Sequence, residues 1–432
     1  MNKILLIQVA ALGHEFLRRQ TGDARVAGLE FRPLSSVFPA LTCSVQATLR
    51  TGEPPAGHGI VGNGFYSREF ARPFFWEQSS ALVQGPRIWD EFRRRGHTVG
   101  VMFWQQSLGN DADVLLSPAP IHKHHGGMIQ DCFSRPTGLY EKLTEKIGRP
   151  FNLAHYWGPR AGRKGTEWIA EATAHVMEDP APDLLLTYLP HLDYELQRNG
   201  PESAAAARSF AELQTALEML IGKADSCGYD VVVLGDYAIE NVDRPVKPNL
   251  LLREEGLLRI RRIQGMSYPD LYSSPAFAVV DHQIAHVVVR DPAQISTLTP
   301  LFENTDGVEK VLGEDEKVNR GIDHPRAGDL VLLAEPGAWF AYPWWENGAE
   351  APDYATHVDI HNKPGYDPCE LFWGFWPFRV STDPTRVAGS HGRTEGAEPA
   401  TWASDLDFMD TPKSILELAR TLRGLLKGGV PT

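Results

Sequence analysis

Residues 38–52 read FPALTCSVQATLRTG, and residues 58–63 follow as HGIVGN. A short apolar run ends at Thr42, a run of small residues follows, and the chain turns through two glycines to Asn63. One interpretation is structural, because a threonine hydroxyl caps a helix start and glycine suits the position past a helix end. The other is functional, because backbone amides and the helix dipole favour an anion at a helix N-terminus. This stretch alone supports both equally.

The composition is that of a globular protein. The chain has 432 residues, of which 42% are hydrophobic and 22% charged, with a formal net charge of -13. This length exceeds that of most single compact cores, so we expect one large domain with insertions or two lobes. The negative charge argues against broad contact with duplex nucleic acid or an anionic membrane.

Cysteine usage and the N-terminal residues bear on the compartment. The four cysteines are widely spaced and form no CxxC pair, which suits a reducing environment, so we expect a cytoplasmic protein. The apolar run near the N-terminus is short, and Glu15, Arg18 and Arg19 follow it directly. It therefore predicts a buried first strand rather than a signal peptide. No other apolar run is long enough to cross a bilayer.

Strand-like and helix-like segments alternate along the chain. The pattern predicts strands over 4–9, 98–104, 183–189 and 229–234, and helices over 88–95 and 202–223. Such alternation indicates an α/β fold with a mostly parallel central sheet covered by helices on both faces. Chemistry gathers at the carboxyl ends of the strands in such sheets. Thr42, Asp193 and Asp236 each follow an apolar run, so we expect them at that edge.

A second region has a different pattern. A strand-like run over 276–290 is followed by a helical segment and by a strand-like run over 307–312. We expect a small inserted α+β lobe over about 271–319, with the main core formed by 1–270 and 320–432.

Three later segments complete a family pattern. They are DYELQRNGP at 193–201, DY at 236–237 and GSHG at 389–392. Together with Thr42, the TG at 51–52 and HGIVGN, they resemble the type I phosphodiesterase/nucleotide pyrophosphatase branch of the alkaline phosphatase superfamily. The landmarks run from residue 4 to about 395, so the resemblance covers nearly the whole chain.

The resemblance implies an alkaline-phosphatase-like fold and a site with assigned roles. Thr42 would be the nucleophile, and Asn63 would donate a hydrogen bond to a phosphoryl oxygen. Asp193, Asp236 and His391 would bind a divalent metal, with zinc expected and manganese possible, because carboxylates and imidazoles suit such ions. A threonine hydroxyl is a poor nucleophile, and two cations would make it usable on a small phosphorylated substrate.

Three positions depart from the family pattern. Ala10 lies near the place where the first strand should end in an aspartate, Gln197 replaces a histidine, and Tyr237 replaces another. The loss of one carboxylate and two imidazoles would weaken a two-zinc centre, because a neutral glutamine is a poor substitute.

Two other segments offer replacement ligands, DHQIAH at 281–286 and HVDIH at 357–361. The surroundings of His282 look strand-like, which would place His286 about 13 Å away at roughly 3.3 Å per residue, too far to share an ion. His361 lies in a Gly/Pro-rich loop, where ligands often reside. His282 and His361 are candidate metal ligands, and hydrogen-bonded or surface histidines are the alternative.

The sequence therefore supports two kinds of function. The first is a metal-dependent hydrolase of phosphodiester or nucleotide pyrophosphate bonds that uses Thr42. The second is a catalytically weakened relative that binds a phosphorylated metabolite or a partner protein. A phosphoryl-transfer enzyme of a biosynthetic pathway is a further possibility.

Overall fold

The computed structural model describes residues 3–125, 127–376 and 378–428, and an eight-stranded sheet lies at its centre. The strand order is β11-β8-β7-β12-β1-β13-β24-β4. The five strands from β8 to β13 are parallel, whereas β11 and β24 join the margins by antiparallel pairing. The strands are β1 (Lys3–Val9), β4 (Arg32–Leu34), β7 (Val99–Met102), β8 (Val114–Pro118), β11 (Cys132–Arg135), β12 (Leu184–Leu189), β13 (Tyr229–Gly235) and β24 (Ala400–Ser404).

The predicted α/β class is confirmed, and the sheet explains the long apolar runs in the sequence. In the register, Leu5 of β1 lies between Leu185 of β12 and Val231 of β13. All three side chains are almost fully buried. Parallel strands covered on both faces need continuous apolar sequence rather than alternation.

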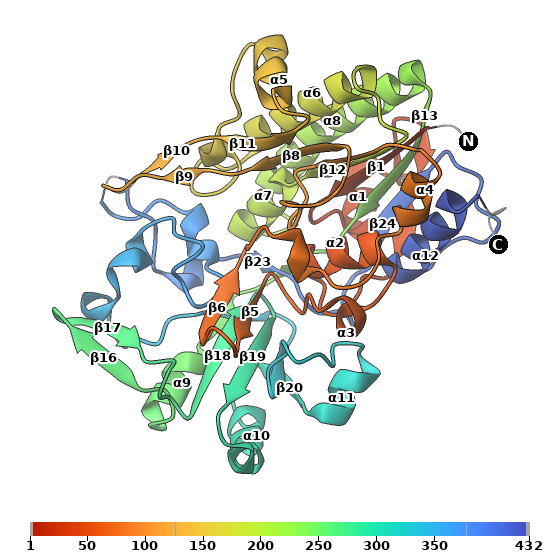
Figure 1. The fold of residues 1–432 in the computed structure, drawn as a ribbon. Coiled ribbons are helices and arrows are strands. Elements are labelled where there is room, and N and C mark those ends of the chain that lie inside the picture. The colour runs from red at the N-terminus through yellow and green to blue at the C-terminus, as the bar shows by residue number, and fades with distance from the viewer. Residues whose placement is uncertain (1–2, 126, 377, 429–432) are drawn as a thin grey trace.

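Helices cover both faces of this sheet. Figure 1 shows α6 and α8 on one side and α2 and α12 on the other. The helices of the main region are α1 (His14–Thr21), α2 (Thr42–Thr51), α3 (Pro55–His58), α4 (Asp90–Arg94), α5 (Leu139–Ile147), α6 (Arg163–Glu178), α7 (His191–Asn199), α8 (Ala204–Cys227) and α12 (Ile415–Leu426). Ser203 caps α8, because its side chain accepts a hydrogen bond from the N–H of Ala206 at 3.1 Å.

A second, antiparallel sheet has the order β18-β19-β21-β20 and its own apolar core. Its strands are β18 (Ala276–Asp281), β19 (Ile284–Val289), β20 (Val308–Leu312) and β21 (Leu330–Ala334), and the nearby helices are α9 (Pro248–Glu254), α10 (Ile295–Glu303) and α11 (Glu314–Asn319). The single strand expected over 276–290 is wrong. The chain turns at His282, whose φ is +60°, and forms a hairpin, so His282 and His286 do not lie on one strand.

Short strand pairs complete the fold. They are β2 (Arg25–Val26) with β3 (Leu29–Glu30), β5 (Gly64–Ser67) with β6 (Arg72–Phe75), β9 (Ile121–His122) with β10 (Met128–Ile129), β14 (Glu240–Asn241) with β23 (Gly389–Ser390), β15 (Arg244–Val246) with β22 (Ala338–Phe340), and β16 (Ile260–Ile263) with β17 (Met266–Pro269).

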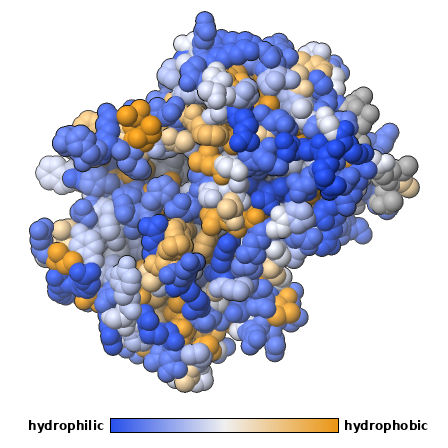
Figure 2. Space-filling model, in the orientation of Figure 1, coloured by the Kyte–Doolittle hydropathy of each residue, from blue (hydrophilic) through white to orange (hydrophobic). Residues whose placement is uncertain are grey.

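Hydrophilic residues predominate on the face drawn in Figure 2. Among the described residues, no helix has the length and apolar character needed to cross a membrane.

Gly235 ends β13 directly before Asp236 and has no room for a side chain. A Cβ at this position would collide with the carbonyl oxygen of Leu12. We expect Gly235→Ala to lower the free energy of unfolding by about 1–3 kcal/mol, because such overpacking forces the backbone to shift. Chemical denaturation measures this change.

Gly222→Ala is the matched control. Gly222 lies in α8, and a Cβ at this position would have open space around it, with no neighbouring residue within 4 Å. Alanine there should raise the free energy of unfolding by about 0.5–1 kcal/mol. Equal effects of the two substitutions would contradict the close approach at Gly235.

Candidate functional site

The candidate site lies where β1, β12 and β13 end. Helix α2 begins with Thr42, α7 carries Asp193, and Asp236 directly follows β13. The backbone N–H of Asp236 donates to the carbonyl of Val9, the last residue of β1, at 3.3 Å. Hydrogen bonds through Tyr237 join Thr42 to Asp193, so the structure gathers these residues at the expected edge.

Thr42 does not cap its helix. The N-cap of α2 is Leu41, and the Thr42 hydroxyl lies 3.0 Å from the hydroxyl of Tyr237. Tyr237 donates its single proton to Oδ1 of Asp193 at 3.2 Å, so in this arrangement Thr42 donates to Tyr237. The capping interpretation is therefore wrong, and the hydroxyl belongs to a chain that ends on a carboxylate.

Gln197 and Tyr366 continue this network. Nε2 of Gln197 donates to Oδ2 of Asp193 at 2.6 Å, and the Tyr366 hydroxyl donates to Oε1 of Gln197 at 2.8 Å. Asp193 and Gln197 lie four residues apart on α7 and so share one helix face. Two positions that depart from the family pattern, Gln197 and Tyr237, are thus both partners of Asp193.

Four rings form a stack, in which two imidazoles lie between two tyrosine rings. Tyr237 stacks on His391 with centroids 3.5 Å apart, and His282 stacks on Tyr366 at 3.7 Å. The two imidazoles join these pairs at 3.9 Å. Nδ1 of His391 donates to the carbonyl of Ala40 at 2.7 Å, which leaves Nε2 as the lone-pair nitrogen of the neutral ring.

Asn63 is tied to Asp281 rather than presented to the hydroxyl of Thr42. Its backbone N–H donates to Oδ2 of Asp281 at 2.6 Å, and its Nδ2 donates to Oδ1 at 3.1 Å. Its Oδ1 accepts from the N–H of Cys43 at 3.1 Å. Asp281 also lies 2.8 Å from Nδ1 of His282. Asn63 therefore connects the start of α2 to the β18–β19 turn.

Asp236 is surrounded by donors. Its Oδ1 accepts from the backbone N–H groups of Ala11 and Tyr237, at 2.9 and 3.0 Å, and its Oδ2 accepts from Nε2 of Gln8 at 3.0 Å. Both carboxylate oxygens thus have N–H partners from the protein itself.

Burial controls protonation throughout the site. Removal from water raises the pKa of Asp193 to about 7, of Asp281 to about 7 and of Asp236 to about 8. Hydrogen bonds to the charged carboxylates lower these pKa values, but the effect of burial is larger. The same burial holds the pKa of His282 and His391 well below the usual range, so both rings are neutral.

The remaining histidine candidate lies elsewhere. His361 is exposed, and its Nδ1 lies 3.1 Å from the carbonyl of Phe75 in β6. Within the described part of the chain, no contact joins it to the Asp193 network. His286 is buried with partners on both ring nitrogens, Val61 and Gly328.

Three members of the network were not identified from the sequence: Gln8, Asp281 and Tyr366. Asp281 carries a recognisable signal, because it ends an apolar run directly before His282. Gln8 is a polar residue inside the first apolar strand, which is an unusual place for an uncharged amide. Tyr366 lies in an irregular loop and has no such signal.

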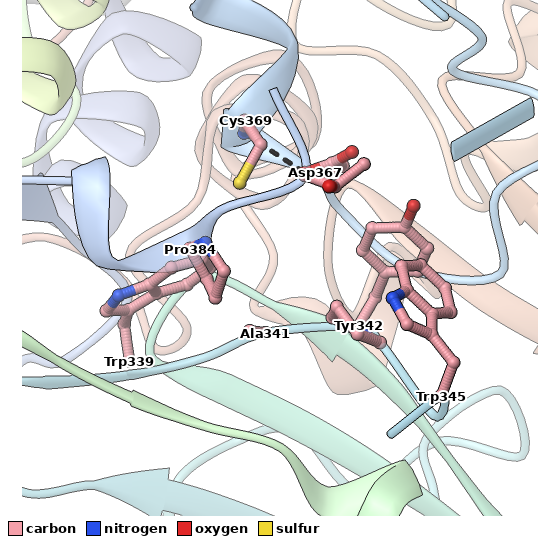
Figure 3. Close-up of a pocket in the computed structure, with 9 residues that line it drawn as sticks. Trp339, Ala341, Tyr342, Trp345, Asp367, Cys369 and Pro384 are labelled. Atoms are coloured by element: carbon pink, nitrogen blue, oxygen red, sulfur yellow. Dashed lines mark hydrogen bonds between the residues drawn. The ribbon is translucent and has the colours of Figure 1, made fainter. Parts of the chain in front are cut away.

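A small hollow lies apart from these residues (Figure 3). Its lining includes Trp339, Tyr342, Trp345, Cys369 and Pro384. The N–H of Cys369 donates to Oδ1 of Asp367 at 3.0 Å. None of the predicted site residues lines this hollow.

Comparison with known proteins identifies the family. A sequence model of type I phosphodiesterases/nucleotide pyrophosphatases matches residues 24–367. The chain belongs to this family. The resemblance seen in the sequence is thereby confirmed, and the protein is a hydrolase of the phosphoesterase and pyrophosphatase type.

Solved structures share the fold at low sequence identity. Phosphonoacetate hydrolase from Sinorhizobium meliloti, in complex with phosphonoformate, has a TM-score of 0.63 and 17% identity, over 98% of this chain and 95% of its own. Murine ectonucleotide pyrophosphatase/phosphodiesterase 5 has a TM-score of 0.61 and 14% identity, over 100% and 96%. A structure of the inactive form of that murine protein, in complex with AMP, has a TM-score of 0.60 and 13% identity over the same shares.

The residues do not fit the two-ion centre that the family resemblance implies. Asp236 has no oxygen free of an N–H donor, and Gln197 presents an N–H to Asp193 where an imidazole ligand would be. Across residues 3–125, 127–376 and 378–428, no three His, Cys, Asp or Glu side chains form a group that could hold a metal ion. Divalent metal binding is thus a prediction of the family resemblance that these side chains do not support.

The raised pKa of Asp236 makes stability depend on pH. The folded state keeps this proton up to about pH 8, whereas the unfolded chain releases it near its ordinary value of 3.8. The free energy of unfolding therefore falls as pH rises between these values. Asp236→Asn cannot ionise, and its amide can donate to Oε1 of Gln8, which has no partner. We expect the variant to gain stability over the wild type as pH rises from about 5 to 8.

Urea unfolding at the two pH values measures this gap. Asp225→Asn, on the exposed face of α8, is the control and should show no widening. A gap between Asp236→Asn and the wild type that stays constant with pH would contradict the assignment.

Proposed function

We propose that the protein hydrolyses phosphodiester or nucleotide pyrophosphate bonds with Thr42 as the nucleophile. The observation that carries this proposal is the hydrogen-bonded chain from the Thr42 hydroxyl through Tyr237 to Asp193. A base whose pKa lies near the working pH is the most effective proton acceptor, and the pKa of Asp193 is about 7.

The chain supplies a complete path for the proton. Thr42 Oγ1 forms a bond to phosphorus while the bond from phosphorus to the leaving oxygen breaks. The threonine proton moves to the Tyr237 oxygen, and the tyrosine proton moves to Oδ1 of Asp193. The proton held by Asp193 then passes to the leaving oxygen, which restores the carboxylate. Water then cleaves the phosphothreonine, giving one proton back to Thr42 and its hydroxide to phosphorus.

The start of α2 supplies electrostatic support. Thr42 is the first residue of this ten-residue helix, so the partial positive charge of the helix N-terminus lies beside its hydroxyl. Backbone amides at such a terminus stabilise phosphoryl oxygens without moving. The proposed substrate is accordingly a small phosphorylated molecule, and a cytoplasmic location remains part of the proposal.

Removal of the nucleophile tests the proposal directly. We expect Thr42→Ala to lower kcat for a chromogenic phosphodiester or a 4-nitrophenyl nucleotide ester by more than about 10³-fold, because the substitution removes the attacking oxygen. Thr42→Ser keeps the hydroxyl and is the matched control. Full activity of the alanine variant would exclude Thr42 as the nucleophile.

Tyr237→Phe interrupts the proton path and keeps the ring that stacks on His391. We expect kcat to fall by about 10²–10⁴-fold with little change in KM, because the hydroxyl relays a proton and the ring keeps its packing. Steady-state kinetics separates the two parameters. Tyr366→Phe, which removes a hydroxyl beyond Asp193 and Gln197 and outside the proton path, should have the smaller effect.

A second function is favoured by one observation. Thr42 is only 4% exposed, and its hydroxyl contacts Tyr237, one of the rings of the stack. A weakened family member that binds a phosphorylated metabolite or a partner protein would need no exposed nucleophile. Binding of AMP or pyrophosphate without turnover, with equal affinity in the wild type and Thr42→Ala, would favour this function over hydrolysis.

A further inference from the structure

We infer that a hydrogen-bonded frame of neutral side chains replaces the family's metal ions, so that this chain holds neither zinc nor manganese beside Thr42. The frame consists of Tyr237, Gln197 and Tyr366 with the two imidazoles between the tyrosine rings. This inference goes beyond the proposed hydrolysis, because it concerns what fills the centre in the absence of any substrate.

The space between Thr42 and Asp193 is already filled. The Tyr237 hydroxyl lies between them, 3.0 Å from Thr42 Oγ1 and 3.2 Å from Asp193 Oδ1. An ion that contacted the threonine oxygen and this carboxylate would have to occupy the same place. A phenol hydroxyl accepts from one side and donates to the other, so it satisfies both groups without a charge.

Asp236 already accepts hydrogen bonds through both carboxylate oxygens. Three N–H groups, two from the backbone and one from Gln8, occupy its two oxygens. The backbone donors cannot turn away without moving the ends of β1 and β13. Ala10, which lies where the family has a second carboxylate, adds no ligand. A cation at Asp236 would therefore have to compete with N–H groups that already donate to both carboxylate oxygens.

Few side-chain atoms that could bind a metal remain around Asp193. Nε2 of His391 and Nε2 of His282 are buried and have no hydrogen-bond partner, and the former lies 3.8 Å from Oδ1 of Asp193. Zinc in proteins takes four ligands in a tetrahedral arrangement, or three and a water, at about 2.0–2.1 Å from nitrogen. Asp193 and His391 supply two, and among the described residues no third His, Cys, Asp or Glu, His282 included, joins them in a group that could hold a metal ion. The position of the family's third ligand holds the Gln197 amide with its N–H toward the carboxylate. Gln197 is thus the residue that keeps this half-site closed.

The experiment adds the missing ligand. The purified full-length wild type and Gln197→His are incubated with zinc, passed through a gel-filtration column, and analysed for metal by inductively coupled plasma mass spectrometry. We expect the wild type to retain well under one zinc per chain and Gln197→His to retain about one, because histidine completes a set with Asp193 and His391. Gln197→Glu is a second variant that supplies an anionic oxygen at the same place.

Two controls make the outcome decisive. Addition of His391→Ala to Gln197→His should abolish the bound zinc, and EDTA should leave the melting temperature of the wild type unchanged. Zinc bound one-to-one by the wild type and released by His391→Ala would overturn the inference. Failure of both Gln197 variants to bind zinc, while folded by circular dichroism, would also overturn it.

These measurements use no substrate. A failure of the hydrolysis proposal, seen as activity that survives Thr42→Ala, would leave the metal content of the wild type unchanged. A failure of the present inference would instead appear in the metal content itself, whether or not Thr42 is the nucleophile.

Discussion

The hydroxyl of Tyr237 is the contact on which the centre depends. It accepts from Thr42, donates to Asp193, and belongs to a ring that stacks on His391. Each of these groups is buried, so the loss of this hydroxyl would leave polar atoms without partners in a medium that penalises them. The tyrosine is therefore a structural requirement of this site as well as a participant in the proposed chemistry.

The neutral character of the site follows from the same burial. Asp193, Asp236 and Asp281 lie close to the start of α2, and removal from water raises the pKa of all three. Without a cation, such a group of carboxylates is tolerated only because protons and N–H donors compensate the charge. The backbone amides of Ala11 and Asn63 supply part of this compensation, which ties the strand ends to the centre.

The main elements of the fold could be predicted from the sequence because its signals are local. The apolar runs of β1, β12 and β13 lie within a residue or so of their expected bounds, since strands buried on both faces must be continuously apolar. The β18–β19 hairpin could not be predicted, because its turn consists of His282 and Gln283 rather than of glycine or asparagine.

The candidate site was predictable only in part, because only some of its residues lie in segments with a recognisable local signal. Thr42, Asp193, Asp236 and His391 lie in separate segments that match the family pattern, so their meeting in one site could be anticipated. The partners that determine what these residues do come from distant segments: Gln8 from the first strand, Asp281 from the second sheet and Tyr366 from a late loop. Contacts of this kind arise from tertiary packing, and no periodicity in a single sequence reports them.

The turn between β18 and β19 has a consequence for how the two sheets depend on each other. Asp281 holds Asn63, and His282 lies within the ring stack, so the tip of this hairpin forms one wall of the centre. His282 adopts a left-handed backbone conformation that costs free energy for any residue with a side chain. A shortened chain without this hairpin would lose that wall, and a hairpin grafted from a distant relative would have to reproduce the same bend to restore it. The second sheet is therefore an integral part of the candidate site.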